Sequence, residues 1–292
     1  MKPAPFEWHA ASSTEEALAL LAQHGDRARL LAGGQSLIPA MNFRLARPSV
    51  LVDLNGVGEL AGITRMVDSS LRLGAMTRQR SVERSAMVAA VAPLLAEAMP
   101  FVAHAQIRTR GTVGGSVAHG DPAAELPAVF AALGARYLVR SRTGERWVSA
   151  GDFATGLFAT ALGQGELLVA IEIPAMAPRT GWAFTEMARR HGDFALAGVA
   201  CTLTTDAAGR CTQARVVLLG VGDGPVVSVG AAAALAGAEP GDEAFRAAAS
   251  AAEGEVDPPS DIHASAGYRR SLAGVLTRRA LARAAERAGA PA

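Results

Sequence analysis

Apolar residues at helical spacing and short apolar runs alternate over the first part of the chain. The stretch ALALLAQHG follows residues 13–16 (Ser-Thr-Glu-Glu) and predicts a short amphipathic helix that begins with a capping box and ends at Gly25. Runs at residues 28–32 and 50–54 predict two buried strands, and the pair Gly33-Gly34 directly follows the first. With a short helix between the strands, this segment forms a small α/β unit.

The middle region, residues 63–174, mixes short strands with helices. Thr143-Gly144 is a hairpin signal between two of the strands. Residues 107–111 lead into a second glycine-rich segment. The predicted strands are residues 71–75, 135–141, 146–149 and 167–173, and the predicted helix is residues 86–98.

The segment 174–181 contains Pro174, Pro178 and Gly181 and is the best linker candidate in the chain. Beyond it, residues 181–219 predict strands, and Ala-rich helices follow, the last from about residue 265 to 287. We therefore expect an α+β protein with three parts. They are an N-terminal α/β subdomain at 1–56, a second α+β subdomain at 57–176, and a smaller C-terminal domain at 177–288.

Composition and charge exclude several classes of protein. Half of the 292 residues are hydrophobic, 19% are charged, and the net charge is +1 without a basic stripe, so nucleic acid is not expected as a partner. Arginine pairs are separated from one another by neutral stretches, which indicates solvated faces or interface salt bridges. They are Arg189-Arg190, Arg269-Arg270 and Arg278-Arg279. Neither a signal peptide nor a membrane-spanning run is apparent, so we expect a cytoplasmic location.

The only cysteines are Cys201 and Cys211, and they do not form a C-x-x-C pair. An iron–sulfur cluster or structural zinc usually needs about four thiolate or imidazole ligands, and no spacing here supplies them. No metal site is therefore expected. If the protein carries out redox chemistry, an organic cofactor must provide it.

Two glycine-rich segments, residues 31–37 and 110–118, are the strongest candidates for chemistry. Paired glycines let a backbone approach a ligand closely and turn successive N–H groups toward one point. Both segments are expected as loops at strand exits, where together they could hold a pyrophosphate without a lysine. Each could also be only a tight turn. Neither matches a P-loop or a dinucleotide-binding G-x-G-x-x-G pattern.

These segments and four further motifs resemble, in order, the FAD-binding medium subunits of the xanthine dehydrogenase and carbon monoxide dehydrogenase (molybdenum hydroxylase) family. The resemblance covers essentially the whole chain. Its motifs are AGGQSLIP from Ala32, RGTVGGS from Arg110, DPAAELP from Asp121, GELL with IEIP from Gly165, ARRHGDFA from Ala188, and DIHASAGYRR from Asp261.

The resemblance implies a two-part FAD-binding domain of the vanillyl-alcohol-oxidase/MurB (PCMH) type, followed by a C-terminal domain with an antiparallel sheet and helices. It places the pyrophosphate and ribityl chain at the two glycine segments, Asp121 and Glu125 near the flavin end, and Leu168 and Phe194 against the ring or its rim. The implied FAD-binding residues are Ala32, Gly33, Gly34, Gln35, Ser36, Leu37, Thr112, Gly114, Gly115, Ser116, Ala118, Asp121, Glu125, Leu168 and Phe194.

Some of these residues have simpler explanations. Asp121 could be a helix N-cap ahead of Pro122, and Glu125 a favourable acid in the first helical turn. Phe194 could be a core residue of a strand. Covalent attachment of FAD at Gln35 is excluded because related flavoproteins with covalent FAD often have His there, so non-covalent FAD is expected. Some relatives carry Lys in a stretch that residues 185–187 (Thr-Glu-Met) occupy here, so a flavin contact from that Lys is not carried over to this chain.

The resemblance implies an oxidoreductase subunit that passes electrons from iron–sulfur clusters to an external acceptor such as NAD, a quinone, oxygen or a carrier protein. The molybdenum cofactor would lie on a large partner subunit and [2Fe-2S] clusters on a small one, in a single or a doubled heterotrimer, with the doubled form favoured. No catalytic side chain is expected. The alternatives are a self-sufficient FAD-dependent oxidase or reductase on the same fold, and a binding module that kept only the fold.

Overall fold

The structure, a computed structural model, describes residues 1–289. The first helix, α1 (Thr14–His24), forms as its sequence predicts. The hydroxyl of Ser13 accepts a hydrogen bond from the N–H of Glu16 at 3.1 Å, and Gly25 ends the helix at a φ of 54°. The Glu16 carboxylate accepts from the N–H and hydroxyl of Ser12, one residue earlier than a standard capping box.

A three-stranded parallel sheet forms the N-terminal part of the fold, with β3 in the centre and α1 packed against it. The short helix α2 (Leu37–Asn42) connects β2 to β3, as expected. The edge strand β1 was not predicted, because it has only four residues, most of them exposed, and carries little apolar signal. The strands are β1 (Glu7–Ala10), β2 (Ala28–Leu31) and β3 (Val50–Asp53).

The middle part contains a five-stranded antiparallel sheet in the order β4-β5-β10-β6-β7. The predicted hairpin is confirmed, with its turn at Thr143 and Gly144. A two-stranded hairpin, β8–β9, follows β7. The strands are β4 (Ile63–Arg65), β5 (Leu71–Gly74), β6 (Arg136–Ser141), β7 (Gly144–Ser149), β8 (Ala154–Gly156), β9 (Ala159–Thr160) and β10 (Leu167–Ile173).

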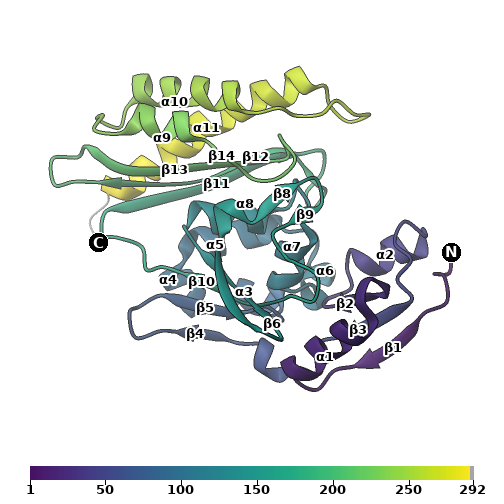
Figure 1. The fold of residues 1–292 in the computed structure, drawn as a ribbon. Helices are drawn as coiled ribbons and strands as arrows, with labels where there is room; N and C mark the ends of the chain where they lie inside the picture. The colour runs from purple at the N-terminus through teal and green to yellow at the C-terminus, as the bar shows by residue number, and fades with distance from the viewer. Residues whose placement is uncertain (290–292) are drawn as a thin grey trace.

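Six helices pack beside this sheet (Figure 1). The single helix expected over residues 86–98 is wrong: it is two helices that meet at Ala92. Pro93 has no N–H to continue the first helix, so it begins a new one instead. The helices are α3 (Gln79–Glu83), α4 (Ala86–Val91), α5 (Pro93–Ala98), α6 (Ala105–Arg110), α7 (Val113–His119) and α8 (Glu125–Ala132).

The second glycine segment is not the loop at a strand exit that its composition suggested. It follows helix α6, and Gly114 and Gly115 lie in the first turn of helix α7. Thr112 is the N-cap, and its hydroxyl accepts a hydrogen bond from the N–H of Gly115 at 3.0 Å. This cap and tertiary packing outweigh the low helix propensity of two consecutive glycines.

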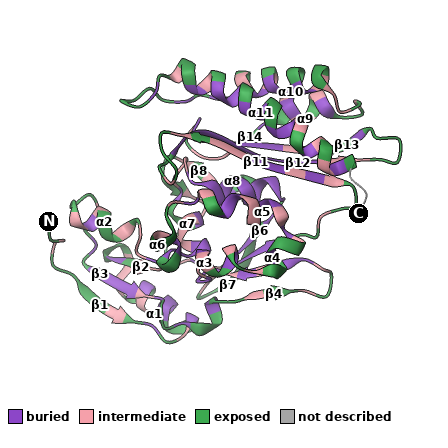
Figure 2. Cartoon of the chain, turned by 180° about the vertical axis from the view of Figure 1, so that it is seen from behind, coloured by how far each residue is buried: buried purple, intermediate pink, exposed green. Residues whose placement is uncertain are grey.

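The C-terminal part is a four-stranded antiparallel sheet covered by helices on one face and by the middle part on the other (Figure 1). Strand β12 is buried along most of its length, as Figure 2 shows. The predicted strands and the long final helix are confirmed. The elements are β11 (Thr180–Ala188), β12 (Ala195–Thr205), β13 (Cys211–Leu219), β14 (Val226–Val227), α9 (Val229–Leu235), α10 (Asp242–Glu255) and α11 (Ala266–Gly289).

One arginine of the pairs that were expected on solvated faces or in interface salt bridges is buried. Arg269 is only 6% exposed. It donates to the carbonyl of Leu196 at 2.7 Å and to the carboxylate of Asp261 at 2.7 Å, and thus ties the start of α11 to the start of β12. A buried guanidinium needs such partners, because an unpaired buried charge is costly.

Glu97 of α5 joins the middle and C-terminal parts. Its two carboxylate oxygens accept from Arg283 at 2.8 Å and Arg287 at 2.5 Å, both on α11. The boundaries 56/57 and 176/177 remain predictions. Among residues 1–289, no helix has the length and apolarity that crossing a membrane requires.

Close packing of α11 on β11 requires a glycine, which gives a stability prediction. A Cβ at Gly181 would overlap the carbonyl oxygen of Ala284 and lie 2.6 Å from the N of Ala288. We expect Gly181→Ala to lower the free energy of unfolding by about 3 kcal/mol, since an overpacked core cannot relax fully. Chemical denaturation measures the change.

The matched control is Gly254→Ala in α10, where an added Cβ meets nothing within 4 Å. Alanine is the better helix former, so this variant should be neutral or more stable by about 0.5 kcal/mol. Equal stability of the two variants would contradict the packing argument.

Candidate functional site

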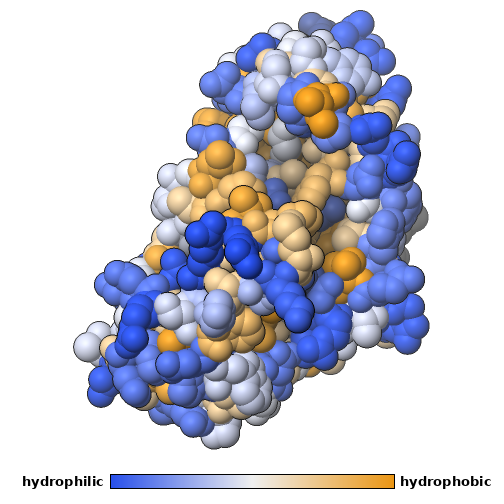
Figure 3. Space-filling view, turned by 90° about the vertical axis from the view of Figure 1, so that its right-hand side faces the viewer, coloured by the Kyte–Doolittle hydropathy of each residue, from blue (hydrophilic) through white to orange (hydrophobic). Residues whose placement is uncertain are grey.

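A cavity of about 970 Å³ lies between the N-terminal, middle and C-terminal parts. Figure 3 shows it as a hollow with apolar atoms inside and hydrophilic residues around its rim. Its volume falls at the upper end of the range of roughly 300–1,000 Å³ typical of ligand sites. All the residues that the sequence proposed for FAD line it, namely Ala32, Gly33, Gly34, Gln35, Ser36, Leu37, Thr112, Gly114, Gly115, Ser116, Ala118, Asp121, Glu125, Leu168 and Phe194.

The two glycine segments, about 80 residues apart in the chain, are in direct contact at this cavity. A Cβ at Gly33 would lie 2.5 Å from the carbonyl oxygen of Arg110 and 2.8 Å from the Cα of Gly111. A Cβ at Gly115 would lie 3.4 Å from the Cβ of Ala32. Gly33 is therefore required for backbone-to-backbone packing between the segments, rather than for the approach of a ligand as its sequence suggested.

The first segment presents a run of free amide hydrogens. The N–H groups of residues 33–36 have no hydrogen-bond acceptor among residues 1–289. Gly34 adopts a φ of 74°, a left-handed conformation that turns successive N–H groups toward one point. Four adjacent donors of this kind suit an anionic oxygen.

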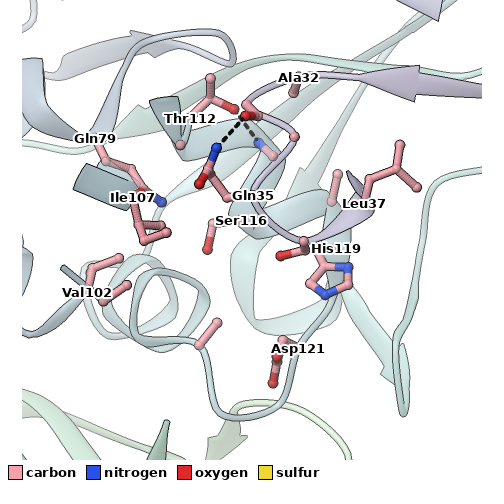
Figure 4. A pocket seen from close by; sticks show the side chains of 18 of the residues that line it. Ala32, Gln35, Leu37, Gln79, Val102, Ile107, Thr112, Ser116, His119 and Asp121 are labelled. Carbon is pink, nitrogen blue, oxygen red and sulfur yellow. Dashed lines mark hydrogen bonds between the residues drawn. The ribbon is translucent and has the colours of Figure 1, made fainter. Parts of the chain in front are cut away.

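The glycine amides of the second segment are already used, which corrects the expectation that both glycine pairs offer bare N–H groups. Val113 donates to the carbonyl of Thr77 at 3.0 Å, and Gly114 donates to that of Ala75 at 2.8 Å. Gly115 donates to the Thr112 hydroxyl. What the second segment presents to the cavity is side chains, above all the hydroxyls of Thr112 and Ser116 (Figure 4).

Two glutamine side chains line the cavity, and Figure 4 places Gln35 near Ser116 and Gln79 beside Ile107. Gln35 donates to the carbonyl of Gly33 at 3.0 Å and so holds the first turn in shape. Gln79 is 5% exposed, and its Oε1 is buried without a partner among the described residues. A buried amide oxygen without a donor is costly, and a bound polar ligand would satisfy it. Nothing in the local sequence indicated Gln79.

The turn at residues 121–125 brings two carboxylates to the cavity. Asp121 accepts from the N–H of Ala123 at 2.9 Å in a side-chain turn, whereas Ala124 is the N-cap of α8, so the prediction of Asp121 as a helix N-cap is wrong. Glu125 is the first residue of α8, where an acid is favourable to the helix dipole, as expected. Burial, assisted by the nearby charge of Asp121, raises the pKa of Glu125 to about 7.

The C-terminal part forms one rim of the cavity with residues that the sequence reading left unassigned. Nη1 of Arg189 lies 2.8 Å from Nδ1 of His263, and because a guanidinium can only donate, this ring nitrogen accepts. Both belonged to motifs of the resemblance, but spacing alone could not bring them together. Phe194 also lines the rim at 70% exposure, so its interpretation as a core residue is wrong.

Arg108 fixes the wall of the cavity next to α6. This side chain is 6% exposed and donates to the carbonyls of Val102 and Ala103 at 2.8 and 3.0 Å. Its other nitrogens bind the Glu83 carboxylate at 2.9 and 3.0 Å, and this pairing is the main reason why the pKa of Glu83 is lowered. The wall is thereby held in one shape despite the positive φ of 47° at Ala103.

Comparison with known families identifies the scaffold. Residues 4–176 match the family described as the FAD binding domain in molybdopterin dehydrogenase, and residues 182–284 match the CO dehydrogenase flavoprotein C-terminal domain. The chain belongs to this flavoprotein family. It is therefore an oxidoreductase component with an FAD-binding domain, and the fold class expected from the resemblance is confirmed.

Individual relatives are similar to this chain over nearly its full length. The chain is 42% identical to the 6-hydroxypseudooxynicotine dehydrogenase complex subunit alpha of Paenarthrobacter nicotinovorans, over 99% of this chain and 97% of that one. It is 41% identical to the carbon monoxide dehydrogenase medium chain of Afipia carboxidovorans, over 99% of both. A solved carbon monoxide dehydrogenase structure from Hydrogenophaga pseudoflava superposes with a TM-score of 0.96 at 40% identity, covering 98% of this chain and 99% of the other.

The residues of this family member fit FAD. The unpartnered Oε1 of Gln79, the four free N–H groups of residues 33–36 and the volume of the cavity suit a ligand with hydroxyls, an anionic centre and a large apolar ring. Gln35 stands at the position considered for a covalent link, and its amide has no chemistry for one. The cavity residues therefore fit FAD that is held by non-covalent contacts.

The contact between the segments gives a binding prediction. We expect Gly33→Val and Gly114→Val to lose most of the bound FAD. A side chain at position 33 would collide with the backbone of Arg110 and force the segments apart, and one at position 114 would collide with Ala75 and displace the start of α7. The ratio of flavin absorbance to protein after desalting measures retention.

Circular dichroism in the same experiment shows whether the variants fold. The control is Gly58→Val, where an added Cβ meets nothing within 4 Å, and it should keep its flavin. A normal flavin content in both segment variants would refute the requirement for close contact.

Proposed function

We propose that this chain is the electron-transfer subunit of a molybdenum hydroxylase complex. It would hold FAD, receive electrons from iron–sulfur clusters of a partner subunit, and pass them to an external acceptor. The observation that carries the proposal is the meeting of residues 32–37 and 112–116 at one cavity whose polar groups match a dinucleotide. The names of the relatives, which include medium chains and complex subunits, support it.

FAD supplies the redox chemistry in this proposal, since it can exchange electrons singly or in pairs. The chain's own residues bind and orient it. Residues 33–36 would donate N–H groups to the pyrophosphate, with the Thr112 and Ser116 hydroxyls on the opposite side. Gln79 would bond the ribityl chain, while Leu168 and Phe194 would lie against the ring or its rim.

The partners follow from the same resemblance. A large subunit would carry the molybdenum cofactor and bind the organic substrate, and a small subunit would carry two [2Fe-2S] clusters. We propose a doubled heterotrimer. The acceptor would be NAD, a quinone, oxygen or a carrier protein, and it would reach the cavity from the rim where Phe194, Arg189 and His263 are exposed.

Reconstitution tests the proposal. The chain purified alone should bind FAD and yet turn over no organic substrate, and activity should appear when the large and small subunits are added. Turnover by the isolated chain would instead support a self-sufficient flavoenzyme. A chain that remains colourless after incubation with FAD would indicate a module that kept only the fold.

Asp121 provides a test at the level of one residue. Asp121→Asn keeps an oxygen that can accept from the N–H of Ala123, so the turn at residues 121–125 should persist and FAD should be retained. Removing a negative charge from the cavity wall should shift the flavin potential to more positive values. Potentiometric titration of the FAD-loaded chain measures this shift. A change in thermal stability without a change in potential would show that Asp121 only supports the turn.

A further inference from the structure

A chain of side-chain hydrogen bonds links the two glycine segments outside the cavity. Asn55, which follows β3, donates from Nδ2 to the carbonyl of Ala32 at 3.1 Å. Arg78, the N-cap residue of α3, donates from Nη2 to Oδ1 of Asn55 at 2.6 Å and from Nη1 to the carbonyl of Arg110 at 2.5 Å. The bonds therefore run from the first segment through Asn55 and Arg78 to the second.

Both of these side chains are themselves held in place. Oδ1 of Asp53 accepts from the backbone N–H of Asn55 at 2.9 Å and also from its Nδ2. The backbone of Arg78 forms a bridge with that of Thr112. Burial, together with the nearby charge of Arg110, lowers the pKa of Arg78, while the charge of Asp53 opposes this. The position of the guanidinium therefore costs free energy, which its hydrogen bonds to two oxygens offset.

The oxygen that Arg78 binds lies at the contact between the segments. A Cβ at Gly33 would be 2.5 Å from the carbonyl oxygen of Arg110, so the two backbones touch at this point. The bond from Nη1 fixes this carbonyl in its orientation. Arg78 thus acts on the contact that brings the segments together.

Hydrogen bonds in the first segment have one direction. The carbonyls of residues 31–34 all accept from the protein, whereas the N–H groups of residues 33–36 have no acceptor among residues 1–289. In the order of those carbonyls, the donors are the N–H of Leu54, Nδ2 of Asn55, Nε2 of Gln35 and the N–H of Ile38. With its carbonyls bound, the turn keeps its N–H groups free for an anion before a ligand arrives. Such preorganisation lowers the entropic cost of binding.

We propose that Asn55 and Arg78 are positioning residues for FAD, which clamp the carbonyls of Ala32 and Arg110 and so hold the free N–H groups of residues 33–36 ready for the pyrophosphate. The proposal rests on the proposed function in taking the cavity as the FAD site. Neither side chain lines that cavity, so both act through the backbone. Without the clamp the turn can rearrange, and FAD must order it on binding.

The affinity for FAD tests the clamp. FAD is titrated into the full-length apo chain, and the change in flavin fluorescence gives Kd. Arg78→Met removes both donors and keeps an unbranched apolar stem, and Asn55→Ala removes the bond to Ala32. We expect each variant to raise Kd about tenfold, as the loss of one or two hydrogen bonds of this kind implies.

A double variant shows whether the two residues act together. Because either change interrupts the same chain of bonds, Asn55→Ala combined with Arg78→Met should bind FAD about as weakly as Arg78→Met alone. A loss equal to the product of the two single losses, about a hundredfold, would show two separate effects and overturn the clamp.

Arg78→Lys distinguishes bridging from charge. Lysine keeps the positive charge but lacks the two separate nitrogens that reach Asn55 and Arg110. Kd should therefore remain several-fold above that of the wild type. Full recovery of the wild-type Kd would show that Arg78 acts only by attracting the phosphates, which would also overturn the clamp.

Arg84→Met is the matched control. It removes the same charge at the other end of α3, where the residue is exposed and does not line the cavity, and it should bind FAD as the wild type does. An equal rise of Kd in this variant would assign the effect to net charge and refute the positioning role.

Thermal unfolding and circular dichroism of the apo variants separate positioning from general stability. The clamp predicts a raised Kd in variants that are fully folded at the temperature of the titration, whereas a merely structural role would lower Tm and leave Kd unchanged. If Arg78→Met does not fold, Asn55→Ala and Arg78→Lys decide the question in the same way. Wild-type Kd in the folded variants would overturn the clamp and leave the FAD site intact. Absence of FAD binding by the wild-type chain would contradict the proposed function as well.

Discussion

The backbone of Gly33 packs against the backbone of Arg110 and Gly111, and that contact brings the two glycine segments together at the cavity. No side chain larger than hydrogen fits between the two segments. Because they touch, the free N–H groups of the first face the hydroxyls of the second across one space. Separation of the segments would leave two unrelated turns and no site.

The two segments have different roles, although their compositions are similar. The first is a turn with a left-handed glycine and unused amides, which suits an anion. The second is the first turn of helix α7, whose amides are bound to Thr77, Ala75 and Thr112. Its glycines make room for neighbouring backbone, and its hydroxyls face the cavity. The first glycine pair therefore exposes hydrogen-bond donors, and the second allows close packing against neighbouring backbone.

The C-terminal part closes the site as well as covering the sheet. Glu97 of α5 ties it to the middle part through ion pairs with Arg283 and Arg287, whereas Arg269 holds α11 to β12 within the C-terminal part. This docking carries Arg189, His263 and Phe194 to the rim of the cavity. The same interface that stabilises the fold thus completes the site.

Local sequence determined the elements that depend on neighbouring residues. The Ser13 cap and Gly25 define helix α1, Thr143-Gly144 defines a hairpin, and alternating or continuous apolar runs define most of the strands. The ordered motifs also predicted the family and the residues that line the cavity. The edge strand β1 and the break at Pro93 were missed, because the first carries little apolar signal and the second lies within a helical pattern.

Tertiary structure alone decided what depends on atoms far apart in the chain. Whether an amide is free or bonded is set by its acceptor, and those of Gly114 and Val113 lie about 40 residues away on a neighbouring element. The burial of Gln79 and the raised pKa of Glu125 likewise arise only when separate elements exclude water together, and the exposed pairing of Arg189 with His263 needs two segments that are distant in the chain. Burial and long-range contact are properties of the folded chain, and no local pattern encodes them.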